Sequence, residues 1–387
     1  MIKREMVPEL KQLIQEYPVV TIIGPRQAGK TTLAKENFKN FYYSNLEDPE
    51  TRELAETDPK AFLRELSFPV IIDEIQRVPK LLSYIQTIVD EENKVGQYVL
   101  TGSHQLQLRE AVTQSLAGRT AILNLLPLSI VEMTKNNISF DYYQEYVFKG
   151  FLPRIYDQKQ RPRIAYANYF QTYVERDVRQ LINLKDVSLF EKFLKLLAGR
   201  VGQVMDLTSL GNDVGVDKKT IHSWLSILEA SFIIFKLPPY FSNFGKRMIK
   251  SPKYYFVETG LLSFLLGIKT SEQVTRDPIV GQIFENLIIA ECLKARYNMG
   301  ELPDLYFYRD NNGNEVDLIF QKGREVVAIE IKSASTYSSS QLKGIKRFRK
   351  ICQDNHKSFL IYNGGQHTLG DNVYALPFKM INRIFEE

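Results

Sequence analysis

A short glycine-rich segment near the N-terminus places the strongest constraint on the fold. Residues 24–31 read Gly-Pro-Arg-Gln-Ala-Gly-Lys-Thr, after the β-branched run 19–23 and before a helical stretch that begins at Thr31. A strand, a glycine loop and a helix in this order bring backbone N–H groups and the positive end of a helix to one point. The sequence therefore predicts a phosphate-binding loop in an α/β fold.

The loop matches the Walker A pattern, which predicts that the chain binds ATP and Mg²⁺. Lys30 is expected to reach the β- and γ-phosphates, and the Thr31 hydroxyl is expected to ligate the metal ion. The predicted nucleotide contacts are Gly24, Pro25, Arg26, Gln27, Ala28, Gly29, Lys30, Thr31 and Thr32. The alternative is a glycine-rich turn with no ligand.

A second motif is an apolar run, residues 68–72, that ends in the carboxylates of Asp73 and Glu74. This is the pattern of a buried Walker B strand, which delivers its acid to the metal ion. Asp73 is predicted to hold Mg²⁺ through water, and Glu74 is predicted to polarise the attacking water. A solvated acid at the end of a strand is the alternative for Glu74.

Two further positions are candidates for contact with the γ-phosphate. The apolar run 98–102 is followed by small polar residues, and either Ser103 or His104 is the expected sensor of the γ-phosphate. Arg119, which precedes another strand-like run, is expected to approach phosphate from its own or a neighbouring subunit. An ordinary surface arginine is the alternative for Arg119.

Together these motifs resemble one prokaryotic family, the archaeal and bacterial AAA-type ATPases that carry a C-terminal domain of unknown function. The matching segments are residues 24–32, 73–76, 100–103, 116–119, 126–132, 150–153 and 175–178. The resemblance implies an AAA-like P-loop core in residues 1–135. Because such ATPases often assemble, it also implies that a homo-oligomer is one option for this chain.

The middle of the chain has helical periodicity over residues 136–185, which predicts a lid or connector. Three helical segments and a strand-rich stretch then follow in residues 186–270 and predict a winged helix. Its expected phosphate contacts are Lys236, Lys246, Arg247, Lys250 and Lys253. Winged helices also dock proteins, so DNA binding and structural docking both remain open.

The C-terminal residues 271–387 contain a pattern of acids and one lysine on consecutive strands. Asp317 lies on one strand-like run, and Glu330 and Lys332 alternate onto one face of the next. This order resembles the Asp/Glu-x-Lys nuclease superfamily, with its restriction-endonuclease-like fold, and Glu285 is the candidate helix acid. The resemblance implies that Glu285, Asp317 and Glu330 bind a metal ion while Lys332 is catalytic. A nuclease-like fold used only for docking is the alternative.

Five cations follow on one predicted helix: Lys343, Lys346, Arg347, Arg349 and Lys350. Such a helix can follow a phosphate backbone or simply face solvent. Nucleic acid, DNA above all, is therefore the expected partner. Two functions follow from these patterns. One is an ATPase that binds or processes nucleic acid, with a C-terminal nuclease. The other is a nucleotide-controlled switch or binding module without nuclease activity.

Composition excludes several other classes. Two cysteines among 387 residues exclude a disulfide framework, and the four histidines have no zinc-ligand spacing. The chain shows neither a secretory signal nor an apolar run long enough to cross a bilayer, so we expect a cytoplasmic protein without membrane contact. The net charge of +5 is too modest for this length to identify a partner.

Overall fold

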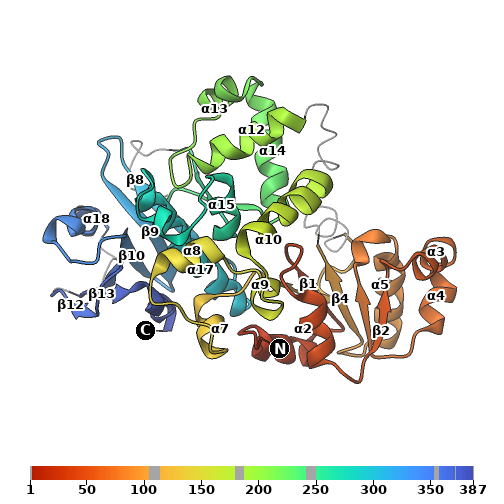
Figure 1. Cartoon of the computed structure of the whole chain (residues 1–387). Coiled ribbons are helices and arrows are strands. Elements are labelled where there is room, and N and C mark those ends of the chain that lie inside the picture. Colours follow the sequence, from red (N-terminus) through yellow and green to blue (C-terminus); the bar gives the residue numbers. More distant parts are fainter. Residues whose placement is uncertain are drawn as a thin grey trace.

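The computed structural model describes residues 2–103, 114–178, 187–240, 250–352, 357–370 and 372–386. Figure 1 shows a parallel α/β sheet at the N-terminus, a helical middle region, and a second α/β sheet near the C-terminus. His104, Lys246 and Arg247, which carry predictions, lie outside the described residues.

The N-terminal sheet is parallel throughout and has the order β2-β3-β4-β1-β5. Its strands are β1 (Val19–Ile23), β2 (Tyr42–Asn45), β3 (Val70–Asp73), β4 (Tyr98–Gly102) and β5 (Thr120–Asn124). Every residue of β1, β3 and β4 is buried, as expected of central parallel strands covered on both faces. The α/β prediction for this region is confirmed, and β4 lies between the two strands that carry the Walker motifs.

Helices cover both faces of this sheet. They are α1 (Val7–Glu16), α2 (Lys30–Asn37), α3 (Pro49–Thr57), α4 (Pro59–Glu65), the 3₁₀ turn η1 (Ile75–Arg77) and α5 (Leu81–Glu92). Proline at the first position and an aspartate cap start α3 and α4, because Asp48 and Asp58 accept hydrogen bonds from the first-turn backbone.

The middle region is helical. Its first helices are α7 (Ile130–Lys135), α8 (Tyr143–Lys149), α9 (Pro153–Asp157), α10 (Pro162–Tyr169) and the π-helix η2 (Phe170–Val178). Next come α12 (Val187–Ala198), α13 (Leu207–Val214), α14 (Lys218–Ala230), the antiparallel strands β6 (Ile234–Leu237) and β7 (Lys253–Phe256), α15 (Thr259–Leu265) and α16 (Ser271–Val274). Three helices before a two-stranded sheet match the predicted order of elements, while the winged helix itself stays a prediction.

The C-terminal sheet has the order β12-β13-β11-β10-β9-β8. Its elements are α17 (Val280–Asn298), β8 (Leu305–Arg309), β9 (Glu315–Lys322), β10 (Glu325–Lys332), η3 (Ser339–Leu342), α18 (Lys343–Ile351), β11 (Lys357–Tyr362), β12 (His367–Thr368), β13 (Val373–Pro377), η4 (Phe378–Met380) and α19 (Arg383–Glu386). Strands β8, β9 and β10 pair antiparallel, whereas β10, β11 and β13 pair parallel.

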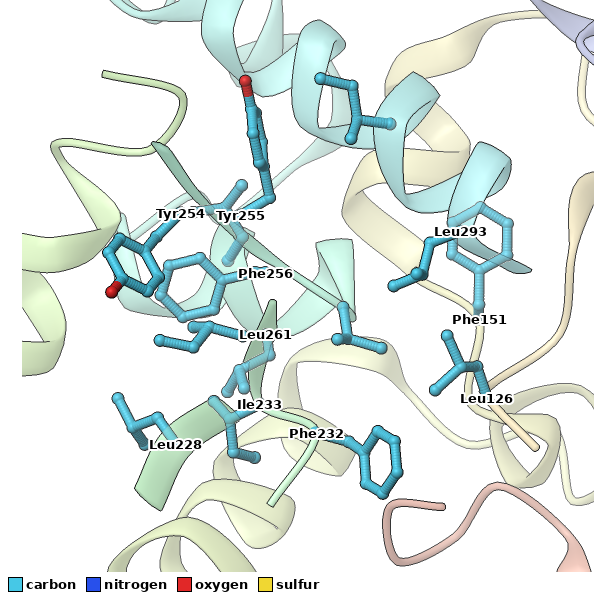
Figure 2. Packing of buried hydrophobic residues seen from close by; sticks show 14 of the residues in the cluster. Leu126, Phe151, Leu228, Phe232, Ile233, Tyr254, Tyr255, Phe256, Leu261 and Leu293 are labelled. Carbon is cyan, nitrogen blue, oxygen red and sulfur yellow. The ribbon is translucent and has the colours of Figure 1, made fainter. Parts of the chain in front are cut away.

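One apolar core runs through all three regions. Leu126 follows β5, Phe151 follows α8, and Leu293 lies on α17, and Figure 2 shows these three side chains close together. The same cluster continues to Phe256 on β7 and Leu228 on α14. The regions are therefore packed against one another through shared hydrophobic contacts. No helix in the described ranges is long and apolar enough to cross a membrane.

Candidate nucleotide site and a buried charge cluster

The phosphate-binding loop leads from β1 into the first turn of α2. Gly29 caps α2 with a φ of 94°, a left-handed conformation that disfavours other residues. Lys30 starts the helix, and its Nζ donates to the carbonyls of Gly24 at 3.0 Å and Pro25 at 2.8 Å. Burial lowers the pKa of Lys30 to about 8, although the Glu74 and Asp73 carboxylates oppose this shift. A phosphate group at the loop would therefore meet the ammonium group of Lys30 in a buried position, away from water.

Oxygen donors suited to Mg²⁺ meet beside this loop. Thr31 Oγ1 donates to Asp73 Oδ2 at 2.9 Å, and Tyr43 on β2 donates to the same oxygen at 2.8 Å. Thr101 on β4 donates to the other oxygen of Asp73. Hydroxyl and carboxylate oxygens are what Mg²⁺ prefers, so Thr31 and Asp73 fit the predicted ion. Neither Tyr43 nor Thr101 is predicted from the sequence as a site residue: Tyr43 lies in no motif, and Thr101 lies in the matching segment 100–103 without an assigned role.

Glu74 lies directly after β3 in a left-handed conformation, with a φ of 59°. Its Oε2 accepts hydrogen bonds from the Gln76 amide and, at 3.3 Å, from the Ser103 hydroxyl. Gln76 also donates to Ser103 Oγ at 3.1 Å. The two predicted residues, Glu74 and Ser103, thus lie together, and Gln76 is an additional member of the group. Strained backbone that is held by neighbours is common at functional sites.

A cavity of about 350 Å³ lies at the phosphate loop, with Glu74 in its wall. It is lined by Arg26, Gln27, Gly29, Lys30, Thr31, Thr32, Glu74, Arg154, Thr172 and Tyr173. A second cavity, of about 510 Å³, lies beside it between the N-terminal segment, α2 and α9. Arg154 lines both cavities, although it belongs to the middle region. The sequence does not identify Arg154 as a site residue, and its only signal is its position directly after the matching segment 150–153.

Arg119 lies at the wrong end of the sheet to reach phosphate in its own chain. Parallel strands β1 and β5 start together, with Val19 opposite Thr120, while the phosphate loop follows the other end of β1. The Val19 N–H donates to the Arg119 carbonyl, and the Arg119 guanidinium pairs with Asp90 of α5, with Nη2 to Oδ2 at 2.8 Å. The expected contact between Arg119 and phosphate in the same subunit is therefore wrong, because the length of β1 separates Arg119 from the phosphate loop.

The second group of predicted residues forms a buried charge cluster where β7, α17, β9 and β10 meet. Its members are Lys253, Glu285, Glu315, Asp317, Glu330 and Lys332. A cavity of about 640 Å³ opens onto it. The predicted residues Glu285, Asp317, Glu330 and Lys332 are thus brought to one place by three separate elements.

Lys332 bridges the two strand acids of this cluster. Its Nζ lies 2.9 Å from Asp317 Oδ2 and 2.8 Å from Glu330 Oε2. Burial opposes ionisation of Asp317, but Lys332 and Lys253 outweigh it and hold the pKa of Asp317 below its usual range. Burial, reinforced by the charge of Asp317, raises the pKa of Glu330 to about 9. Near neutral pH, Asp317 is therefore ionised and Glu330 is protonated, so that the two acids together carry one negative charge.

Lys253 is the member that the sequence placed wrongly. It was expected on an exposed wing, but it is 2% exposed, with Nζ 3.0 Å from Glu285 Oε1 and 2.5 Å from Glu315 Oε1. Tyr255 also donates to Glu285 Oε1, at 2.5 Å. The expected phosphate contact of Lys253 is wrong, because every residue of β7 is buried.

In this arrangement the predicted nuclease metal ligands are paired with lysines, and metal binding by Glu285, Asp317 and Glu330 stays a prediction. Among the residues that the structure describes, no group of three or more His, Cys, Asp or Glu side chains is placed to hold a metal ion. The physical reason is that the ammonium groups of Lys253 and Lys332 lie between the carboxylates of Glu285, Asp317 and Glu330.

Three family matches divide the chain. Residues 16–134 match the AAA domain, and this match contains the whole phosphate loop and both Walker motifs. This region is an AAA-type P-loop ATPase domain. Residues 140–272 match a domain of unknown function (DUF8612), which covers the predicted lid and winged helix together. Residues 280–381 match another domain of unknown function (DUF4143), a description that does not include nuclease activity.

Several whole-length relatives are themselves uncharacterized proteins. One from Mycobacterium tuberculosis is 29% identical over 98% of this chain and 84% of its own length. Another from Haemophilus influenzae is 25% identical over 93% of each chain. Among solved structures, a Walker-type ATPase of Pyrococcus abyssi is similar over 68% of this chain and 96% of its own, with 13% identity and a TM-score of 0.45. That score is too low to indicate a shared overall fold.

Proposed function

We propose that this protein hydrolyses ATP to ADP and phosphate with Mg²⁺. The observation that carries the proposal is the position of Glu74, held by Gln76 and Ser103 beside Lys30 and the Thr31–Asp73 pair. In this account Glu74 orients water and receives its proton while the water oxygen bonds to the γ-phosphorus and the bond to ADP breaks. Mg²⁺ held near Thr31 and Asp73 would neutralise charge on the phosphates.

The two neighbouring cavities divide the nucleotide between them. The 350 Å³ cavity, with Lys30 and Thr31, suits the phosphates. The 510 Å³ cavity, which Leu33 and Leu128 line together with Gln158, suits a nucleoside with apolar faces and polar edges. Arg154, present in both linings, is then placed to contact the phosphates from the middle region.

Phosphate release by the purified protein tests the ATPase proposal. We expect Mg²⁺-dependent release of phosphate from ATP and its loss in Lys30→Ala, because the loop then lacks its only lysine for the phosphates. The outer lysine Lys35, which lies over the Tyr43 ring at 4.0 Å, provides a matched control as Lys35→Ala. Equal phosphate release by all three proteins would refute the assignment.

We further propose that the C-terminal region binds nucleic acid through α18. Its inner residues Ile345 and Phe348 are buried, and all five of its charged residues are cations. The helix also lies at the charge cluster, since a β-carbon on Gly344 would overlap Glu330 Oε1 and the Glu315 carbonyl oxygen. A phosphate backbone along the outer face of α18 would therefore reach the mouth of the cluster.

Fluorescence anisotropy with labelled DNA and RNA at several salt concentrations tests this surface. We expect binding that weakens as salt rises, and a clear loss in the double variant Lys346→Glu, Lys350→Glu. The control is Lys195→Glu on α12, an exposed lysine on a different region. Identical binding by both variants would exclude α18 as the contact surface, and absence of binding in the wild type would favour the alternative, a switch that docks protein.

Nuclease activity is a second candidate function. It is favoured by one observation, the meeting of Asp317, Glu330 and Lys332 at a single point. Incubation of DNA and RNA with Mg²⁺ or Mn²⁺ tests it. Cleavage that Lys332→Ala removes would support this candidate, and no cleavage by the wild type would leave the ATPase with a binding domain.

A further inference from the structure

Arg4 precedes the first helix and lies outside the segment that matches the AAA domain. Its side chain is nevertheless only 5% exposed and reaches three partners. Nη1 donates to the Ala28 carbonyl at 2.7 Å, Nη2 donates to the Leu126 carbonyl at 2.6 Å, and Nε donates to Glu132 Oε1 at 2.9 Å. A guanidinium has donors in a rigid planar fork, so these three bonds hold it in one orientation.

The bond to Ala28 has a direct consequence for the phosphate loop. In a planar trans peptide the carbonyl and the following N–H point in opposite directions. Because the Ala28 carbonyl faces Arg4, the Gly29 N–H faces away from Arg4, and Gly29 lines the same cavity as Lys30 and Thr31. That cavity is where a phosphate would sit, and a loop N–H that points into it is a donor for phosphate oxygen.

In the nucleotide-free loop, the plane of the Ala28–Gly29 peptide would be free to rotate if nothing held it. Gly29 has a φ of 94°, and glycine allows many backbone conformations at little cost. Without a partner for the Ala28 carbonyl, the peptide plane can rotate and withdraw its N–H from the phosphate. Arg4 removes this freedom before the nucleotide arrives, which lowers the entropic cost of binding.

Arg4 is itself held by a buried polar junction. Glu132 is fully buried and satisfied, since its oxygens also accept from the Glu5 and Ser129 N–H groups at 2.8 and 2.9 Å. The segment between Leu126 and Glu132 is in turn bonded to α17. There the Ile130 N–H donates to Glu291 Oε2 at 2.7 Å, and Lys294 Nζ donates to the Leu128 carbonyl at 2.9 Å.

We infer that Arg4 is a positioning residue of the nucleotide site, which sets the Ala28–Gly29 peptide for phosphate binding. This inference rests on the proposed ATPase function and adds a residue outside the matched domain to it. The phosphate loop is thereby braced by the N-terminal segment and, through residues 126–132, by the C-terminal helix α17.

The test compares wild type with Arg4→Met, Arg4→Lys and the adjacent control Lys3→Met, whose side chain is exposed. ADP affinity is measured by calorimetry with Mg²⁺, and kcat and KM are measured for ATP. Arg4→Met is expected to weaken ADP binding and to raise the KM for ATP, each about 10- to 100-fold, with kcat nearly unchanged. This factor corresponds to the loss of one hydrogen bond from a charged donor. Arg4→Lys should fall between, and Lys3→Met should match wild type.

Glu132→Gln separates positioning from general stability. It removes the ion pair but leaves the Arg4 bonds to Ala28 and Leu126, so we expect a lower Tm with ADP affinity retained. Wild-type ADP binding that Arg4→Met leaves unchanged would overturn the inference alone. A wild type that binds no ADP would overturn the ATPase proposal with it. If Arg4→Met does not fold, Arg4→Lys decides: weaker ADP binding at an unchanged Tm supports the inference, and unchanged binding refutes it.

Discussion

Lys253 Nζ lies 3.0 Å from Glu285 Oε1, so that strand β7 of the middle region supplies the cation for a carboxylate on helix α17. Burial alone would lower the pKa of Lys253, but the carboxylates of Glu285 and Glu315 outweigh it and raise that pKa above its usual range. The lysine is therefore charged at any physiological pH, and the two regions share one electrostatic centre.

Removal of this lysine should be costly. Lys253→Met leaves the largely buried carboxylate of Glu285 without its cation, whereas Glu315 keeps its pair with Arg309. Loss of one partner of a buried pair destabilises by about 3–5 kcal/mol. We expect a fall of that size in the free energy of unfolding, measured with urea. The control Lys236→Met removes an exposed lysine on the neighbouring strand β6. Equal stability of the two variants would contradict this account of the cluster.

The proton on Glu330 predicts a specific dependence of stability on pH. Its folded pKa of about 9 lies above the ordinary value of about 4.3, so between these values the folded protein holds a proton that the unfolded chain releases. Stability should therefore fall as pH rises through this window. Glu330→Gln, which mimics the protonated acid, should reduce the fall. Urea midpoints at pH 5 and pH 8 measure it, and an identical change in both proteins would rule out a protonated Glu330.

ATP binding should also depend on pH through Lys30. Its pKa of about 8 in the nucleotide-free protein means that the amine is increasingly neutral above that pH. Phosphate favours the charged form, so binding above pH 8 must take up a proton, and ATP affinity should fall as pH rises. Calorimetry at pH 9 in two buffers with different ionisation enthalpies counts the proton. Equal affinities at pH 7 and pH 9.5 would show that Lys30 does not titrate there.

Arg119 should be dispensable for nucleotide binding within one chain. It is paired with Asp90 at the sheet end remote from the phosphate loop. We expect Arg119→Ala to bind ADP as tightly as wild type, by calorimetry, and to hydrolyse ATP normally as a monomer. A lower kcat that appears only at concentrations where the protein assembles would instead place Arg119 in a neighbouring subunit's site.

Local patterns predicted the elements that a few consecutive residues define. The strand, loop and helix around Lys30 and the acid pair at Asp73 were readable, because each motif needs only its own neighbours in the sequence. Arg4, Tyr43 and Arg154 were not, since each reaches the site from a distant segment and lies in no recognised spacing.

The C-terminal cluster shows the same limit. Glu330 and Lys332 share a strand face, as alternation predicted, and they meet Asp317 through the adjacent antiparallel strand. The lysine that completes the cluster, Lys253, comes from outside the domain, so no pattern within residues 271–387 could identify it. The order of the N-terminal sheet, with β4 between β1 and β3, likewise depends on tertiary pairing.

The most direct test of the ATPase assignment compares Glu74→Gln with wild type in two measurements, ATP binding by calorimetry and phosphate release in a single turnover. The Glu74 carboxylate accepts hydrogen bonds from Gln76 and Ser103, whereas Lys30 is held by a carbonyl of the phosphate loop. Loss of the Glu74 carboxylate should therefore leave ATP binding intact. We predict ATP affinity within about threefold of wild type and hydrolysis slowed by at least about 100-fold. Phosphate release at the wild-type rate by Glu74→Gln would contradict the assignment of the catalytic site.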